Sequence, residues 1–583
     1  MSALAAPSAA PEINTLADFW RAANIPEGPA WTEQIKLRNR PFRHQVTGLN
    51  LLAQDICAGL WDEPGTGKTL QAQAHLLWLV SLGNKVMCVM PPVLVEQFKN
   101  SFSANFPGID PYVSIATYSG NPEERTILLQ EWDRSGWPQI LVMSNDFFSG
   151  KSPTELKALE RTRAKWRKKR DELLHAWNTG GWKAAATLCG YQNKPEEEAR
   201  KLTAARVKKA KNTEQKKETP ADTAGPALWL KKGYVHITLD EAVSVKNPGS
   251  DLHRAVKKFA GSDNGLVLMT GSPIENTPTD AYGLVSLLTP ERYGSYRNFE
   301  RIHVRQDDSG RFPIVIGYEN LDYLWQSLYL KGRRITKREA LDLPPQLFSE
   351  RTVRLAPAHA ALYKKLCQER VLELGDKVID ATAASSLYIK SQRMLLCPEL
   401  FHDAENHGPW KEENTLLTSL DELIKELSGH KLVVFAWFTE SIHKLTARYA
   451  KLNPAVLFGE TTAAERERQK AKFIQDDTCR LIIMNPRSGG VGVDGLQQVC
   501  SHAVFAESVS TPGLLDQAIS RLHRSGQKSE TVNVYFLTAL STVAVTLRNK
   551  LIAKEGTANA VVRDAKKLLA DLLGEEGLQG SIE

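Results

Sequence analysis

Three segments that lie far apart in this chain of 583 residues contain residue types able to act on phosphates. Residues 60–69 end in glycines, a lysine and a threonine, Asp240 and Glu241 are adjacent carboxylates, and residues 517–527 contain two arginines three positions apart. Glycine-rich turns can cradle phosphates, carboxylates can hold a metal ion and activate water, and arginines can stabilise phosphate charge. Together these segments predict one ATPase site divided between two lobes.

The glycine-rich segment precedes a run, 70–82, whose pattern is compatible with a helix. Glycines let backbone N–H groups turn toward phosphate oxygens, and the start of a helix adds a positive dipole. We expect Lys68 to neutralise the β- and γ-phosphates and the Thr69 hydroxyl to ligate Mg²⁺. The general pattern has glycine where Asp62 stands, so the segment alone leaves a plain glycine-rich turn as the alternative. The predicted ATP-binding residues of the segment are Gly65, Thr66, Gly67, Lys68 and Thr69.

Asp240 and Glu241 directly follow an apolar, strand-like run at 235–239. In parallel α/β sheets, ligands bind at the carboxyl ends of such strands. We expect Asp240 to hold Mg²⁺ and Glu241 to orient and deprotonate the attacking water. An isolated Asp-Glu pair is a common surface feature, but a preceding buried strand and the presence of Lys68 favour the catalytic interpretation.

On a helix, Arg521 and Arg524 would project from one face, because residues three positions apart are neighbours there. Their planar side chains stay charged at neutral pH and can contact several phosphate oxygens. One or both are expected to complete the catalytic site by stabilising charge on the γ-phosphate. A structural salt bridge is the alternative for an arginine pair considered alone.

The composition is that of a globular chain, with 42% apolar and 24% charged residues, and the length predicts about three to five structural units. The seven cysteines are scattered without a C-x-x-C pair. This spacing favours a reducing compartment and argues against a zinc ribbon or a disulfide framework. The chain has no stretch of about 18 apolar residues and no basic, apolar leader, so we expect neither secretion nor a membrane partner.

The net charge of +7 is concentrated in residues 151–220, which contain 19 Lys/Arg and 9 Asp/Glu. Within them, residues 161–170 combine seven cations with Trp166. Such a cluster can bind nucleic-acid phosphates and release counterions, with Trp166 available to pack or stack. The hypothesis is therefore a helical projection that clamps DNA. A solvated charged helix is the alternative, and RNA or a protein remains open as its partner.

Changes in pattern predict an α/β fold with two main lobes, helical insertions and a helical linker region. The expected parts are a loose arm with a short helix at 1–35, a first lobe at 36–290 with a basic helical insertion at 151–228, a helical protrusion or linker at 291–410, a second lobe at 411–545, and a helical tail at 546–583 with an amphipathic stretch at 565–573. The expected strands are 86–90, 140–143, 235–239 and 265–269 in the first lobe, and 431–435 and 481–484 in the second.

An ordered series of motifs over about residues 36–545 resembles that of the Swi/Snf-type DNA-dependent ATPases, which are superfamily-two helicases. Residues 42–45 resemble the glutamine motif of the family, which implies that Gln45 reads adenine. Residues 62–69 keep the family form Asp-Glu-x-Gly-x-Gly-Lys-Thr, so Asp62 is a family trait. The arginine segment keeps the last motif, which implies that Gln517 also belongs to the nucleotide site.

Several positions depart from the family pattern. Val243 stands where the Asp-Glu-Ala-His motif has histidine, Ser272 where threonine is commoner, and Asp494 where asparagine is usual. The family's tryptophan before the last motif is missing in 508–512. These departures imply that the coupling between the two lobes is tuned differently in this chain.

The resemblance implies two RecA-like parallel-sheet lobes, with ATP and Mg²⁺ in the cleft and duplex or forked DNA across both lobes. Family members couple hydrolysis to translocation on duplex or branched DNA, which remodels DNA or protein–DNA complexes. The weaker DNA-contact candidates, at strand ends, are Pro91, Asn145, Thr439 and Ser488. The alternatives are a strand-separating helicase or the motor of a nuclease system, and a non-hydrolysing DNA-binding scaffold. We expect a cytoplasmic, DNA-associated protein of a bacterium or of a phage-infected host cell.

Overall fold

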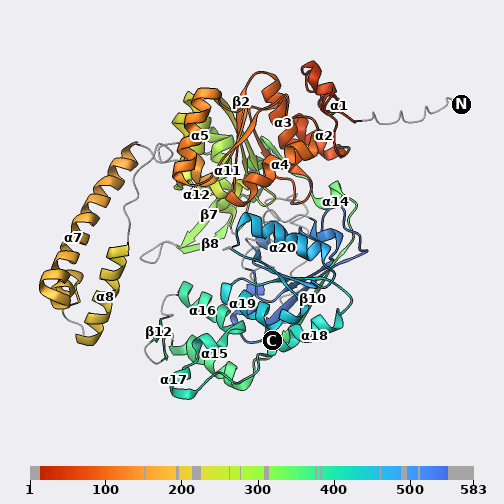
Figure 1. Cartoon of the computed structure of the whole chain (residues 1–583). Helices are drawn as coiled ribbons and strands as arrows, with labels where there is room; N and C mark the ends of the chain where they lie inside the picture. Colours follow the sequence, from red (N-terminus) through yellow and green to blue (C-terminus); the bar gives the residue numbers. More distant parts are fainter. Residues whose placement is uncertain are drawn as a thin grey trace.

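The structure is a computed structural model with two α/β lobes, and one lobe lies above the other in Figure 1. It describes residues 13–149, 153–191, 196–212, 225–261, 263–275, 277–307, 314–369, 371–374, 377–380, 384–459, 461–486, 495–509, 512–545 and 547–548.

The first lobe is built on a seven-stranded sheet in which every neighbouring pair is parallel. Its strands in spatial order are β3 (Ile115–Tyr118), β4 (Ile140–Ser144), β2 (Lys85–Met90), β5 (Tyr234–Asp240), β6 (Gly265–Met269), β1 (Cys57–Leu60) and β9 (Gly332–Arg333). All four strand runs predicted for this lobe are present. They form neighbouring strands, so their carboxyl ends lie along one edge of the sheet.

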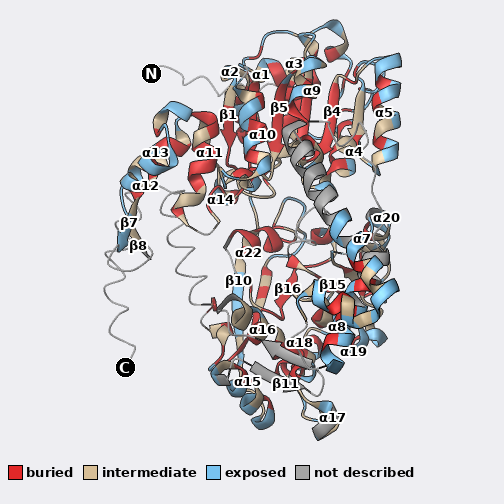
Figure 2. Cartoon of the chain, turned by 90° about the vertical axis from the view of Figure 1, so that its left-hand side faces the viewer, coloured by how far each residue is buried: buried red, intermediate tan, exposed pale blue. Residues whose placement is uncertain are grey.

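Both faces of this sheet are buried. Along β2, Met87 and Val89 belong to the core on one face, whereas Val86 and Cys88 belong to the core on the other. A strand that is buried on both faces reads as a continuous apolar run, which explains why the sequence revealed it. The helices of the lobe include α2 (Arg43–Gln54), α3 (Lys68–Ser81), α4 (Val95–Asn105), α5 (Pro122–Ser135), α6 (Asn145–Ser149), α9 (Pro226–Lys231), α10 (Asp251–Ala260) and α11 (Ala281–Leu288). Figure 2 shows buried strands between helices with exposed outer faces.

The N-terminal segment is packed more firmly than the predicted loose arm. It contains the expected short helix, α1 (Leu16–Ala22), capped by Thr15. The Trp20 side chain is 1% exposed, and its indole N–H donates to the carbonyl oxygen of Ala74 on α3 (3.1 Å). Residues 13–35 therefore contribute to the core of the first lobe.

The second lobe is built on a six-stranded sheet, again with every neighbouring pair parallel. Its spatial order is β10 (Gln346–Val353), β17 (Val532–Ala539), β16 (His502–Phe505), β13 (Leu432–Phe435), β15 (Leu481–Met484) and β14 (Ala455–Leu457). The two predicted strands of this lobe are β13 and β15. Helices around it include α18 (Thr415–Glu426), α19 (Thr439–Arg448), α20 (Ala463–Gln475) and α22 (Pro512–Ile519). Two parallel-sheet lobes confirm the predicted fold class.

Residues 291–410 contain more strand than the predicted helical linker. Strand β9 pairs with β1 of the first sheet, and β10 pairs with β17 of the second. Two antiparallel hairpins are also present, β7 (Val304–Asp307) with β8 (Ile314–Tyr318) and β11 (Val371–Leu374) with β12 (Lys377–Asp380). The expected helices are α12 (Tyr296–His303), α13 (Leu321–Tyr329), α14 (Lys337–Ala340), α15 (Pro357–Glu369), α16 (Ala384–Leu396) and α17 (Ala404–His407). Strand β10 was not predicted from the sequence, because it is a partly exposed edge strand without an apolar run.

The helical character predicted for the basic insertion is present in two helices of its described part, which stand away from the lobes in Figure 1. They are α7 (Pro153–Cys189), which is interrupted at Gly181 (φ 66°), and α8 (Glu196–Asn212). Leu173, Ala185 and Val207 form a small buried cluster between these helices, which we call the α7–α8 arm. The side chain of Trp166 lies outside the described residues.

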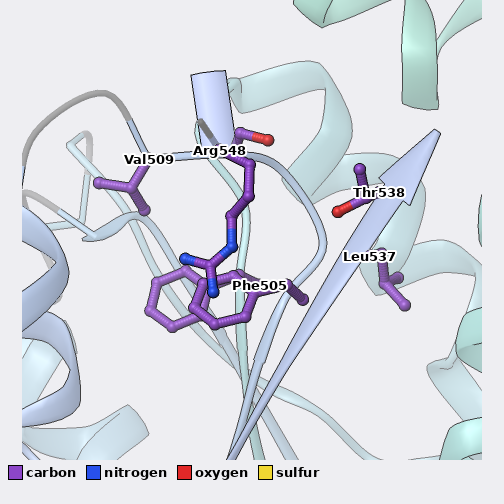
Figure 3. Close-up of a pocket in the computed structure, with 7 residues that line it drawn as sticks. Phe505, Val509, Leu537, Thr538 and Arg548 are labelled. Carbon is purple, nitrogen blue, oxygen red and sulfur yellow. The ribbon is translucent and has the colours of Figure 1, made fainter. Parts of the chain in front are cut away.

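Most of the tail, including the predicted amphipathic stretch 565–573, lies outside the described residues. Its described residue Arg548 places its guanidinium 4.0 Å from the centre of the Phe536 ring, which stacks on Phe505 (Figure 3). Val509 and Thr538 line a small cavity beside this stack. Among the described residues, no helix is both long and apolar enough to cross a membrane.

Candidate functional site

The phosphate loop joins the end of β1 to the start of α3. Gly65 and Gly67 have φ angles of 88° and 84°, a conformation that glycine adopts without a steric penalty. Gly67 is the N-cap residue of α3, and among the described residues no side chain forms a capping hydrogen bond there. The first N–H groups of the helix are therefore available to an anion, as a phosphate-binding loop requires.

Lys68 is the first residue of α3, and its ammonium group reaches back over the loop. Its Nζ donates to the carbonyl oxygens of Asp62 (2.5 Å) and Glu63 (3.2 Å). Burial lowers the pKa of Lys68, while the nearby charges of Asp240 and Glu241 act in the opposite direction. The lysine thus lies among the carboxylates that the sequence predicted beside it.

Gln45 and His44 support the phosphate loop from α2. Gln45 Oε1 accepts from the Phe42 N–H (2.9 Å), and its Nε2 donates to the carbonyl oxygen of Thr66 (3.2 Å). His44 Nε2 also contacts that oxygen, at 2.8 Å. A methyl group added to Gly67 would come within 2.2 Å of Gln45 Nε2. The predicted adenine-reading residue is therefore in direct contact with the loop.

Asp240 ends β5, and Glu241 follows it with a φ of 50°. The Glu241 N–H donates to Asp240 Oδ1 (3.0 Å). A non-glycine residue in the left-handed region is uncommon and occurs often at functional sites. Burial and the adjacent Asp240 raise the pKa of Glu241 to about 7, against the opposing charges of Lys68 and Arg521. Burial also raises the pKa of Asp240, again against Lys68.

The second lobe supplies the other side of this site. Gln517, on α22, donates from Nε2 to Glu241 Oε2 over 3.1 Å. Arg521 lies close enough to favour the charged forms of Asp240 and Glu241. A methyl group added to Gly65 would lie 3.3 Å from Arg524 Cβ. The segments that the sequence predicted to form one site therefore meet in the structure.

The arginine pair does not lie on a helix. Helix α22 ends at Ile519, and residues 520–526 form turns and a bend. The Arg521 N–H donates to the carbonyl oxygen of Ala518, three residues earlier (3.2 Å), and Gly526 has a φ of 86°. These tight turns, rather than a shared helical face, bring Arg521 and Arg524 to the site.

The residues after β6 contact α22 at the same interface. A methyl group added to Gly513 would lie 3.2 Å from both the Cβ and the Oγ of Ser272. Glu275 accepts a 2.7 Å hydrogen bond from Lys246 Nζ. Val243 lies in the short 3-10 helix that follows Glu241, at the position where the motif that the sequence resembles has histidine. The lobes therefore meet beside the carboxylates without that histidine.

Three of the four predicted DNA-contact candidates lie near the ends of parallel strands. Pro91 follows β2, Asn145 follows β4, and Thr439 begins α19 after β13. Ser488 and Asp494 lie outside the described residues. Sequence reasoning did not identify Arg333 and Arg334, whose side chains bond to the phosphate-loop residues Asp62 and Glu63. Their only sequence signal was two adjacent cations in a segment without clear periodicity.

Two family models match consecutive parts of the chain. The SNF2-related domain matches residues 44–400, and the helicase conserved C-terminal domain matches residues 415–526. The chain belongs to the SNF2-related family. This finding confirms the resemblance that the motifs predicted.

Among similar SNF2-related proteins, an uncharacterized ATP-dependent helicase of Mycoplasma genitalium is 26% identical over 54% of this chain and 29% of its own length. The transcription regulatory protein SNF2 of Saccharomyces cerevisiae is 24% identical over 55% of this chain and 20% of its own. The DNA annealing helicase and endonuclease ZRANB3 of Bos taurus is 24% identical over 62% of this chain and 32% of its own length. This SNF2-related chain thus matches between a fifth and a third of each relative's length.

Among solved structures, the chain is similar to the SWI2/SNF2 ATPase core of Sulfolobus solfataricus in complex with dsDNA. The sequence identity is 18% and the TM-score is 0.34, with 91% of this chain and 97% of that chain covered.

Proposed function

We propose that this chain is a DNA-dependent ATPase that couples ATP hydrolysis to translocation on duplex or branched DNA. The observation that carries the proposal is the 3.1 Å hydrogen bond between Gln517 and Glu241, which joins the two lobes at the predicted water-activating carboxylate. A site divided between two lobes can convert a change in the nucleotide into a movement of one lobe against the other.

The residues at this site fit ATP and Mg²⁺. The phosphate loop offers uncapped helix N–H groups and Lys68 to the phosphates, while Thr69 and Asp240 offer the hydroxyl and carboxylate oxygens that Mg²⁺ prefers. When bound there, Mg²⁺ would neutralise charge on the phosphates. Gln45 and Gln517 complete the proposed nucleotide-binding set.

The proposed chemistry is attack by water on the γ-phosphorus of ATP. The water oxygen forms the new bond, the bond to the β–γ bridging oxygen breaks, and ADP leaves with that electron pair. Glu241 accepts the proton of the water, since its raised pKa suits proton transfer near neutral pH. Arg521 and Arg524 stabilise the charge on the transferred phosphoryl group.

The first experiment measures ATP hydrolysis without nucleic acid and with duplex DNA, single-stranded DNA, forked DNA or RNA, for wild type and Glu241→Gln. We expect duplex or forked DNA to stimulate wild-type hydrolysis, and the substitution to reduce kcat by roughly a hundredfold or more. A wild-type protein that hydrolyses no ATP under any of these conditions would contradict the proposal and favour a DNA-binding scaffold.

A second assay distinguishes translocation from strand separation. A triplex-forming strand on an intact duplex reports translocation, and a labelled strand on a forked duplex reports unwinding. We expect ATP-dependent displacement of the triplex strand without release of the duplex strand. Release of the duplex strand would favour the helicase alternative.

We further propose that the α7–α8 arm clamps DNA against the body. Exposed Lys168 and Lys169 continue the basic cluster that begins at 161. Helix α9, the next described helix after the arm, packs on the first lobe, because Trp229 is fully buried and its ring centre lies 5.3 Å from that of Tyr118. An exposed, positively charged projection is a suitable feature for a phosphate-binding clamp.

Deletion of residues 155–218 tests the arm directly. We expect weaker DNA binding with a shallower salt dependence, and unchanged ATP hydrolysis in the absence of DNA. A milder variant replaces both Lys168 and Lys169 with alanine, and its matched control replaces the exposed pair Lys257 and Lys258 on α10. Equal salt-dependent affinities of the deletion and the wild type would exclude the arm as a clamp.

A further inference from the structure

The linker between the lobes runs directly beside the phosphate loop. We call residues 331–346 the strap. Three backbone N–H groups on the first-lobe side donate to the strap, from Gly59 to the carbonyl oxygen of Lys331 (2.8 Å), from Trp61 to that of Arg333 (2.8 Å) and from Glu63 to that of Ile335 (3.0 Å). The parallel pairing of β1 with β9 therefore continues into the first residues of the phosphate loop.

Glu63 connects the strap to the catalytic lysine. Its Oε1 accepts from Arg334 Nη2 (2.8 Å), and its Oε2 accepts from the backbone N–H of Lys337 (2.9 Å). Its carbonyl oxygen accepts from Lys68 Nζ (3.2 Å). A movement of the loop when Lys68 transfers to a phosphate would therefore act directly on the main chain at Lys337.

The side chain of Lys337 reaches the other lobe. Its Nζ contacts Ser520 Oγ (2.5 Å) and Asp516 Oδ1 (3.2 Å), and the residue is 4% exposed. Gln517, which contacts Glu241, lies between these two partners in the sequence. A buried ammonium is costly without partners, so the contacts of Lys337 with Asp516 and Ser520 connect the strap to the end of α22.

The far end of the strap contacts the turn between the two arginines. His523 Nε2 bonds to the carbonyl oxygen of Pro344 (2.9 Å), and Gln346 Nε2 donates to His523 Nδ1 (2.5 Å). The strap therefore contacts the second lobe on both sides of Arg521. It has the contacts needed to set the position of that arginine relative to the phosphate loop.

We propose that Lys337 is a positioning residue that couples the phosphate loop, through Glu63 and the strap, to the placement of Gln517 and Arg521. This inference rests on the proposed ATPase function. This coupling through Glu63 and the strap does not involve Val243, the position at which the motif that the sequence resembles has histidine. It also differs from the direct contact between Ser272 and Gly513, because it passes through the linker.

The test compares Lys337→Met, which removes the charge and keeps much of the stem, with Lys337→Arg. The matched control is Lys431→Met, because Lys431 Nζ also makes two hydrogen bonds, to the carbonyl oxygens of Phe473 (2.5 Å) and Asp476 (2.8 Å), within the second lobe. The measurements are kcat and KM for ATP with DNA, the melting temperature, and the radius of gyration from small-angle scattering without nucleotide.

For Lys337→Met, we expect kcat to fall by about tenfold or more, because the variant loses the charge-assisted hydrogen bonds of Lys337 to Asp516 and Ser520. KM for ATP should stay within about twofold, and the radius of gyration should increase as the lobes separate. Lys337→Arg should recover part of kcat. Lys431→Met should keep the wild-type kcat and radius of gyration even if its melting temperature falls.

Asp516→Asn separates positioning from simple stability. Combined with Lys337→Met, it should lower kcat little beyond the larger single effect, because both changes break one contact. Wild-type kcat in Lys337→Met, or equal losses of kcat in the Lys337 and Lys431 variants, would overturn the inference. A wild type without ATP hydrolysis would instead overturn the proposed function. In that case the scattering comparison would test the positioning role of Lys337 by itself. An unchanged radius of gyration in Lys337→Met would overturn that role.

Discussion

Gln517 of the second lobe donates a 3.1 Å hydrogen bond to the Glu241 carboxylate of the first. The two residues are 276 positions apart in the sequence. The carboxylate that is expected to activate water is thus oriented by a side chain that leaves when the lobes separate. Hydrolysis should therefore depend on lobe closure as well as on nucleotide binding.

Gln517→Ala should lower the DNA-stimulated kcat by roughly tenfold, because one hydrogen bond to a charged group is worth about 1.5–3 kcal/mol. Exposed Gln475, at the end of α20, provides the control, and Gln475→Ala should hydrolyse ATP at the wild-type rate. Steady-state hydrolysis with saturating DNA measures both. A Gln517→Ala enzyme with wild-type kcat would show that Glu241 is oriented without help from the second lobe.

Gly513→Val should act as a wedge between the lobes. The added side chain would begin 3.2 Å from the Cβ and Oγ of Ser272 and 3.5 Å from Glu275 Cγ. Valine has a better helix propensity than glycine, so α22 itself should not be weakened. We therefore expect kcat to fall by about tenfold while the melting temperature of the second lobe is kept. Gly513→Ala is the graded control, with a smaller loss, and equal rates for all three proteins would contradict the wedge.

The sequence predicted the parts of the site whose physical cause is local. Lys68 follows a glycine pattern that phosphate binding requires, and Asp240 ends a largely buried strand, which has the pattern of an apolar run in the sequence. The strap was missed because its bonds connect residues far apart, such as Arg333 and Asp62, separated by 271 positions. Only the fold brings them together. The helical face considered for Arg521 and Arg524 is not present, because a three-residue spacing is equally compatible with turns.

Arg333→Ala should destabilise the first lobe strongly. Asp62 is fully buried, and its carboxylate accepts from Arg333 Nε (3.3 Å) and Nη2 (3.0 Å), as well as from the Ile335 N–H (3.1 Å). Removal of one partner of a buried ion pair leaves an uncompensated charge and costs about 3–5 kcal/mol. Urea unfolding of the variant measures the loss. Arg254→Ala, which removes an exposed i,i+3 pair with Asp251, is the control and should cost less than about 1 kcal/mol.

The double variant Asp62→Asn with Arg333→Met gives the complementary result. It removes both charges, so it should recover part of the stability lost in Arg333→Ala. Equal stabilities of the single and double variants would indicate that packing, rather than the buried charge, accounts for the loss.

Glu507 should make the second lobe less stable as the pH rises. Its carboxylate accepts from Ser441 Oγ (2.6 Å) and from the Phe438 N–H (3.1 Å) before α19, and the residue is 6% exposed. Burial raises the pKa of Glu507 to about 7, against these hydrogen bonds. The folded-state pKa of Glu507 lies above the unfolded value. Its contribution to the free energy of unfolding is therefore fully present below about pH 4.5 and is lost as the pH rises through about 7.

Glu507→Gln removes the titration. Its amide oxygen can still accept from the N–H groups of Trp437 and Phe438, and its amide nitrogen can donate to Ser441 Oγ. Between pH 5 and pH 8, we expect the wild type to lose up to about 2–3 kcal/mol of unfolding free energy relative to the variant. Urea unfolding at several pH values, followed by second-lobe fluorescence, measures it. Glu467→Gln on the exposed face of α20 is the matched control. Curves for Glu507→Gln and wild type that stay parallel from pH 5 to pH 8 would show that Glu507 remains ionised in the folded lobe.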